Sequence, residues 1–104
     1  MSKKLPYEQL MGLIAEAAVN YQQAETKRNA LRRELNMLYR TYFAAYGHPY
    51  PDQPRKRIDP DDDAFFGVLR FTDPAFRRWL DARSLTTSTK RKMRGLIQRL
   101  ERSL

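Results

Sequence analysis

The stretch that decides the fold runs from Tyr7 to Ala45 and reads YEQLMGLIAEAAVNYQQAETKRNALRRELNMLYRTYFAA. Read in alternating steps of three and four, this stretch gives a series that is apolar except at one position. A strict seven-residue repeat of this kind places its side chains on one stripe of an α-helix, and it is typical of a helix that pairs with another helix. The stripe comprises Tyr7, Leu10, Ile14, Ala17, Tyr21, Ala24, Arg28, Leu31, Leu35, Leu38, Tyr42 and Ala45.

The predicted helix is long for so short a chain. No glycine or proline occurs between Gly12 and Gly47, and Gly47 stands where a helix C-terminus favours glycine. At 1.5 Å per residue such a helix would be roughly 60 Å long. A chain of 104 residues is too small to cover it with one compact core, so we expect a homo-oligomer or a subunit of a larger assembly. The residues expected to form this association seam are Leu10, Ile14, Tyr21, Arg28, Leu31, Leu35, Leu38 and Tyr42.

Arg28 is the one charged residue of the seam, and two interpretations of it stay open. Its long stem can carry the charge sideways into solvent where the apolar stripe is narrow. Alternatively, it sets the register or orientation of the pairing, as a single polar residue can in coiled coils.

Proline and aspartate separate the long helix from the rest of the chain. The segment from His48 to Pro60 contains four prolines, which predicts an extended, stiff linker. Four aspartates, Asp59, Asp61, Asp62 and Asp63, precede an apolar run, and acidic residues there cap a helix and complement its dipole. We therefore interpret these carboxylates as a helix cap and expect no metal site.

Two further sequence patterns typical of helix N-termini divide the C-terminal part of the chain. Thr72-Asp73-Pro74 is a cap followed by a proline at a first helical position, and Ser84 to Thr89 reads as a turn that supplies another cap. The predicted fold class is all-α, with one long N-terminal coiled-coil-like helix followed by a small bundle of three short helices around an aromatic-rich core. The expected organisation is a long helix at 1–46, a proline-rich linker at 47–60 and a small basic helical domain at 61–104.

Composition excludes several classes of function. The chain has no cysteine and a single histidine, His48, so it lacks disulfides, thiolate metal sites and cysteine nucleophiles. No catalytic motif or phosphate-binding glycine loop is present. No secretory signal and no apolar run long enough for a membrane span are found. We expect a non-enzymatic cytoplasmic protein without a cofactor.

The net charge of +8 is concentrated in the C-terminal part of the chain. It amounts to +3 over residues 1–46, −2 over 47–63 and +7 over 64–104. A concentrated positive charge favours polyanionic partners, nucleic acid first and an acidic protein surface second. The residues expected to contact nucleic acid are Arg77, Arg78, Lys90, Arg91, Arg94, Gln98 and Arg102.

A helix that starts at Pro74, a Ser/Thr-rich turn and a basic helix together resemble, in outline, the helix-turn-helix DNA readers. The stretch from Phe76 to Thr89 resembles the DNA-clasping N-terminal domain of tyrosine recombinases in its helix caps and its hydrophobic pattern. The shorter stretch Leu85-Thr86-Thr87-Ser88, which precedes the basic helix, is similar to a segment of the helical small subunits of CRISPR effectors. No family is assigned on these likenesses, and each implies nucleic-acid contact.

Two hypotheses from different classes follow. In the first, the protein binds DNA or RNA, self-associates through residues 7–45 and contacts phosphate with residues 77–102. In the second, it is a protein-interaction module, such as an inhibitor or adaptor from a phage or other mobile element, that docks its basic face on an acidic protein surface. The two differ in whether the wild-type protein binds nucleic acid tightly or only weakly.

Overall fold

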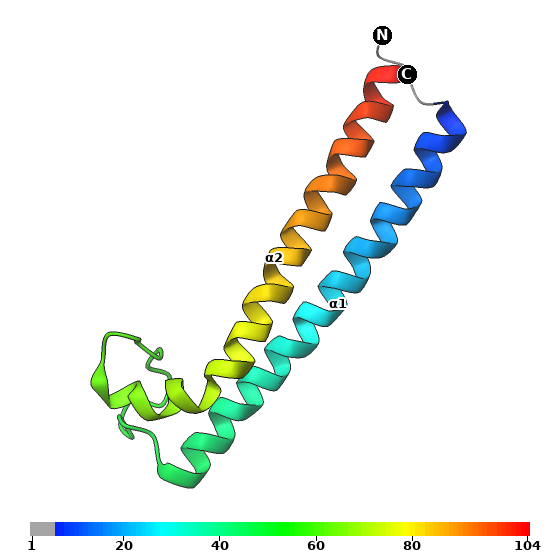
Figure 1. Cartoon of the computed structure of the whole chain (residues 1–104). Coiled ribbons are helices and arrows are strands. Elements are labelled where there is room, and N and C mark those ends of the chain that lie inside the picture. Colours follow the sequence, from blue (N-terminus) through cyan, green and yellow to red (C-terminus); the bar gives the residue numbers. More distant parts are fainter. Residues whose placement is uncertain (1–5) are drawn as a thin grey trace. The chain divides into compact units, whose positions relative to one another are not determined.

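The computed structural model describes residues 6–104, and these are helical apart from one connecting segment (Figure 1). Helix α1 spans Tyr7–Tyr46, a single 3-10 turn η1 spans Asp63–Phe65, and helix α2 spans Phe66–Ser103. The all-α class and the long N-terminal helix are therefore as predicted, whereas the small bundle of three short helices is wrong.

Helix α2 continues through the first predicted break. Pro74 lies inside the helix, and Thr72 does not cap a new one. The Thr72 hydroxyl instead donates to the carbonyl oxygen of Val68, at 2.9 Å, and its side chain is buried. An interior proline removes one backbone hydrogen bond and crowds the preceding turn, which bends a helix without necessarily ending it. Burial of residues on both sides of Pro74 keeps α2 continuous.

The predicted turn at residues 84–89 is also helical. Its hydroxyl groups bond back to carbonyl oxygens of the preceding turn, as in Thr86 to Ala82 and Thr89 to Leu85, both at 2.8 Å. This back-bonding satisfies Ser and Thr inside a helix, where they would otherwise favour a cap. Without a turn between two helices, the likeness to helix-turn-helix DNA readers no longer holds.

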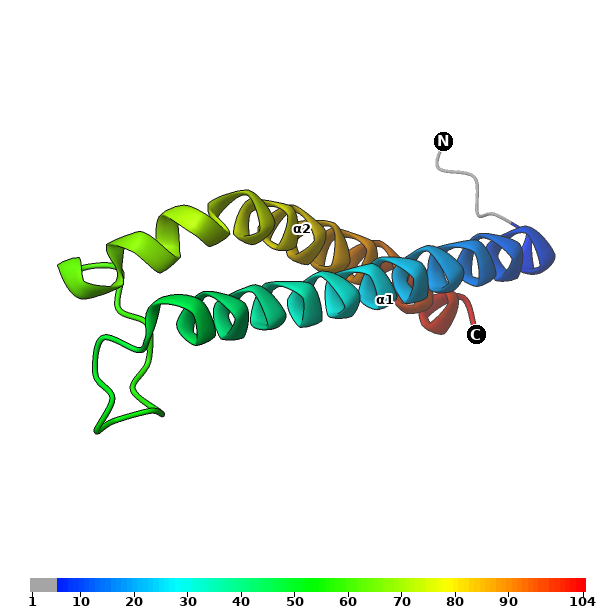
Figure 2. The same cartoon turned by 90° about the horizontal axis from the view of Figure 1, so that it is seen from below.

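The chain forms two compact units, each containing part of both helices. The terminal unit consists of the described residues up to Asn29 together with residues 81–104, and the loop unit consists of residues 30–80. In each unit a stretch of α1 packs beside a stretch of α2 that runs the other way (Figures 1 and 2).

Small side chains fill the interface between the two helices in the terminal unit. Its buried residues are Leu10, Ala17, Ala24, Ala82 and Thr86. On α1 the buried positions follow one another at intervals of seven, which is the repeat read from the sequence. Alanine at such positions buries little apolar surface, so this unit has a thin core.

The loop unit has a bulkier core. Leu35 and Phe65 are completely buried, and Val68 is nearly so. The aromatic ring of Tyr42 packs on the ring of Phe71 with centroids 5.6 Å apart. The predicted aromatic core is correct only in part, because Phe66 and Phe71 remain 64% and 48% exposed.

The connecting segment between the helices contains turns closed by backbone hydrogen bonds (Figure 2). Gly47 ends α1 as predicted, with φ at 82° and its N–H bonded to the carbonyl of Phe43 at 2.8 Å. Two consecutive turns follow, closed by the N–H groups of Gln53 and Lys56. Asp62 caps η1 by accepting the N–H of Ala64 at 2.9 Å, so the capping interpretation of this aspartate is confirmed.

Candidate functional site

Three arginines and one glutamine follow one side of α2 in the terminal unit. Arg91, Arg94, Gln98 and Arg102 succeed one another at intervals of three, four and four residues, which brings them onto one side of a helix. All four are exposed, and we call them the basic surface. Lys90 is half-buried beside them, and the nearby Lys92 and Arg99 are exposed.

Among residues 6–104, no carboxylate forms an ion pair with the basic surface. Three ion pairs are found within residues 6–104, and none of them includes a residue between Lys90 and Arg102. Six Lys and Arg lie between residues 88 and 102 with one acid, Glu101. Like charges at helical spacing repel one another, so this arrangement costs stability unless an anion offsets it.

Arg94 lies close to α1. The Tyr21 hydroxyl donates to Glu25 at 2.9 Å, and this hydrogen bond raises the pKa of Tyr21. The positive charge of Arg94 acts on the pKa of Tyr21 in the opposite direction, as does that of Arg28. Arg94 therefore forms the edge of the basic surface that borders α1.

Arg77 and Arg78 belong to the loop unit, so the structure does not group them with the other predicted contacts. Arg77 pairs with Asp73 at 2.9 Å, and Arg78 pairs across to Glu34 of α1 at 3.1 Å. These pairs are solvent-exposed and contribute little to stability. They do lower the positive charge that these two arginines offer to a partner.

Helix α2 of the same chain covers the association seam in each unit. Leu10 and Leu35 are buried, and the other six seam residues are half-buried. Arg28 reaches sideways, with Nη2 at 4.0 Å from Glu25 and at 3.0 Å from the Asn29 side chain. Its charge thus lies at the border of the seam, as the first interpretation expects. Covering the seam does not require a second copy, and self-association stays a prediction.

Apolar side chains of α1 remain exposed on the terminal unit. Tyr7, Met11, Leu13 and Val19 are between 39% and 59% exposed. The sequence carried a signal for this surface, because Met11 and Leu13 flank the apolar stripe and widen it. The seven-residue repeat does not predict that these side chains are exposed.

Similarity does not identify the protein. The chain matches no family model, no curated protein and no solved structure. Within residues 6–104, neither long helix has an apolar stretch that could span a membrane.

Proposed function

We propose that this protein is a non-enzymatic nucleic-acid-binding protein whose basic surface contacts the phosphate backbone. The observation that supports the proposal is the row Arg91, Arg94 and Arg102, exposed on one side of a helix and without a carboxylate partner in residues 6–104. A polyanion would relieve the repulsion among these charges, and each arginine can hold a phosphate with two parallel hydrogen bonds.

Backbone contact of this kind does not depend on base sequence. Arginines on phosphate displace condensed counterions, so the affinity falls steeply as salt is added. Phosphate contacts set the position of a protein on nucleic acid, whereas base contacts specify a sequence. We accordingly expect this helix to bind several sequences with similar affinity.

The test is a triple variant, Arg91→Gln with Arg94→Gln and Arg102→Gln, measured by gel shift on duplex DNA, single-stranded DNA and RNA. Glutamine keeps nearly the same helix propensity and removes three charges. The slope of log affinity against log salt should become shallower by about 0.7 to 0.9 for each phosphate that is no longer neutralised by an arginine. Thermal stability should hold or rise, because repulsion is relieved.

A matched control removes three charges elsewhere. Arg33, Arg40 and Arg70 are exposed in the loop unit and form no ion pair among the described residues. Changing all three to Gln should alter the salt slope much less than the change on the basic surface. If both triple variants lose affinity equally, the affinity depends only on the net charge of the protein, and the assignment to the basic surface is overturned.

The exposed apolar residues of α1 favour a second candidate, a protein-interaction module that docks on an acidic protein. Exposed apolar side chains can contribute to a protein-binding surface, and phosphate contact has no need of them. These exposed side chains are also the apolar residues that α1 leaves for self-association. Light scattering should show an oligomer that Met11→Gln with Val19→Gln dissociates. A wild-type monomer with tight nucleic-acid binding would exclude this candidate.

A further inference from the structure

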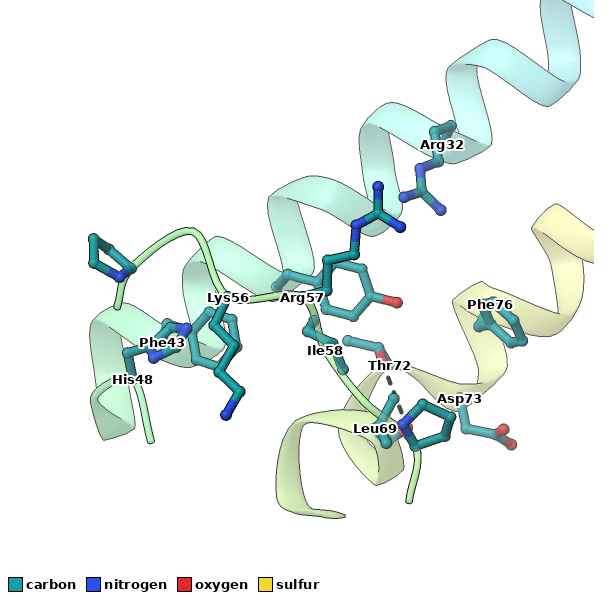
Figure 3. A pocket seen from close by; sticks show the side chains of 13 residues that line it. Arg32, Phe43, His48, Lys56, Arg57, Ile58, Leu69, Thr72, Asp73 and Phe76 are labelled. Atoms are coloured by element: carbon teal, nitrogen blue, oxygen red, sulfur yellow. Dashed lines mark hydrogen bonds between the residues drawn. The ribbon is translucent and has the colours of Figure 1, made fainter. Parts of the chain in front are cut away.

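The loop unit contains an open pocket with a volume of about 910 Å³ (Figure 3). Its walls come from α1, the connecting segment and α2, all within residues 30–80. Pockets of this size accommodate small organic molecules. The pocket exists because the connecting segment folds back on the helices.

Apolar and aromatic side chains form most of the pocket wall. Phe43, Ile58, Leu69 and Phe76 all line it. The Phe43 ring packs against the His48 ring with centroids 4.8 Å apart, which fixes the position of both. Such a wall accepts an apolar body, and rings in particular, because aromatic pairs gain from offset or edge-on contact.

Three cations also line the pocket. Arg32 holds its guanidinium over the Trp79 ring, 4.9 Å from the centroid, and Lys56 holds its ammonium 3.8 Å from the Tyr50 centroid. Arg57 makes no ion pair with any residue in the described part of the chain. Figure 3 shows the head groups of Arg32 and Arg57 on the same side of the pocket.

The Asp73 carboxylate and the imidazole of His48, two acceptor groups of the pocket, are already engaged. Asp73 is the only carboxylate that lines it, and this carboxylate pairs with Arg77 at 2.9 Å. His48 accepts the N–H of Tyr50 on Nδ1 at 2.9 Å, so a neutral His48 carries its proton on Nε2. The polar groups left for a ligand are mainly donors. A ligand with an acceptor-only head group suits such a pocket.

We infer that this pocket binds a small organic anion with an apolar, ring-bearing body and a carboxylate or phosphate head held by Arg57 and Arg32. A nucleobase fits less well, because its edge presents donors as well as acceptors. The inference is independent of nucleic-acid binding by the basic surface, which lies in the other unit.

Naphthaleneacetate is a suitable probe, titrated into the full ¹⁵N-labelled chain and followed by NMR. Two control ligands separate the contribution of the ring from that of the charge. Naphthaleneacetamide keeps the ring and removes the charge, and acetate keeps the charge and removes the ring. Since hydrogen bonds to charged groups are the stronger ones, the acid should bind about tenfold tighter than the amide. Acetate should bind far more weakly than either, and the shifted amides should lie around Phe43, Ile58 and Phe76.

Two arginines in the same segment provide a matched pair of variants. Arg57→Gln should weaken naphthaleneacetate about tenfold and leave the amide unchanged, since it removes only the partner of the charged head. Arg55→Gln makes the same change in charge outside the pocket lining and should leave both affinities as they were. Both residues are exposed, so neither change threatens the fold.

Three results would overturn the inference: equal affinity for acid and amide, equal effects of the two variants, or shifts confined to the terminal unit. The glutamine triple variant of the basic surface should bind naphthaleneacetate like the wild type. A failure of one proposal is therefore distinguishable from a failure of the other.

Discussion

The two units pair the same two helices in different ways. The loop unit buries Phe65, Leu35 and Val68, whereas the largest buried residue of the terminal unit is Leu10 among alanines and a threonine. The part of α2 in the terminal unit, residues 81–104, carries seven Lys and Arg against two acids. Stability is thus expected to come mainly from the loop unit, while the thinly packed terminal unit presents charge and apolar surface outward.

The largest expected effect on stability compares the core of the loop unit with the core of the terminal unit. Phe65→Ala should destabilise the protein by about 3–5 kcal/mol in urea unfolding, because it removes a fully buried ring and leaves a cavity. Phe66→Ala is the neighbouring control and should cost much less, since Phe66 is 64% exposed. If Leu10→Ala in the terminal unit proves as costly as Phe65→Ala, the two units contribute equally and the comparison fails.

A second variant probes the thin core of the terminal unit. Ala24→Leu inserts a larger side chain where the helices meet and should cost about 1–3 kcal/mol through overpacking. Ala15→Leu adds the same volume to an exposed position of α1 and should be nearly neutral in the same thermal melts. A neutral Ala24→Leu would mean that the helices are not closely packed at this alanine.

A third test examines close packing in the loop unit. A β-carbon on Gly67 would clash with the Tyr42 hydroxyl, so Gly67→Ala must displace that ring. We expect a net destabilisation, although alanine gains about 1 kcal/mol in helix propensity. In the Tyr42→Phe background only the contact with the ring carbon at 3.3 Å remains, so Gly67→Ala should cost less than it does in the wild type. Unfolding of the four proteins forms a double-mutant cycle, and additive effects would contradict the contact.

The smallest effect concerns pH and the connecting segment. The Tyr50 hydroxyl donates to the Asp62 carboxylate, which lowers the pKa of Asp62 from its usual 3.8 and raises the pKa of Tyr50 from its usual 10.0. The Asp62 contribution is present above pH 3.8 and is lost as pH falls through the lowered pKa. The Tyr50 contribution is present below pH 10.0 and is lost as pH rises through the raised pKa.

Tyr50→Phe isolates this hydrogen bond. The stability difference between wild type and variant should be present near neutral pH and shrink at both pH extremes, as measured by urea unfolding. The cap that Asp62 provides to the Ala64 N–H remains in the variant, so the comparison reports on the Tyr50 hydroxyl alone. A difference that persists unchanged at low pH would exclude the carboxylate as the acceptor.

Local chemistry was enough to predict α1. Its seven-residue repeat needs no knowledge of the rest of the chain, and Gly47 can adopt the positive φ that ends a helix at little cost. Asp62 was equally predictable, because a carboxylate before an apolar run satisfies N–H groups a few atoms away. The exposure of Arg91, Arg94 and Arg102 also follows from helical periodicity alone.

The second helix and the pocket could not be predicted in this way. Thr72 and Pro74 form a helix start by every local rule, yet burial against α1 keeps α2 continuous and turns the Thr72 hydroxyl back to Val68. The buried positions of α2 in the terminal unit are alanine and threonine, and a sequence pattern does not mark these residue types as core residues. They become core residues because small residues of α1, such as Ala24, are buried at the same interface. The sequence alone determined which residues repeat at helical spacing and where the charge lies. Only the tertiary structure decided that the seam meets its own chain and that the connecting segment closes a pocket, because both depend on contacts between residues far apart in sequence.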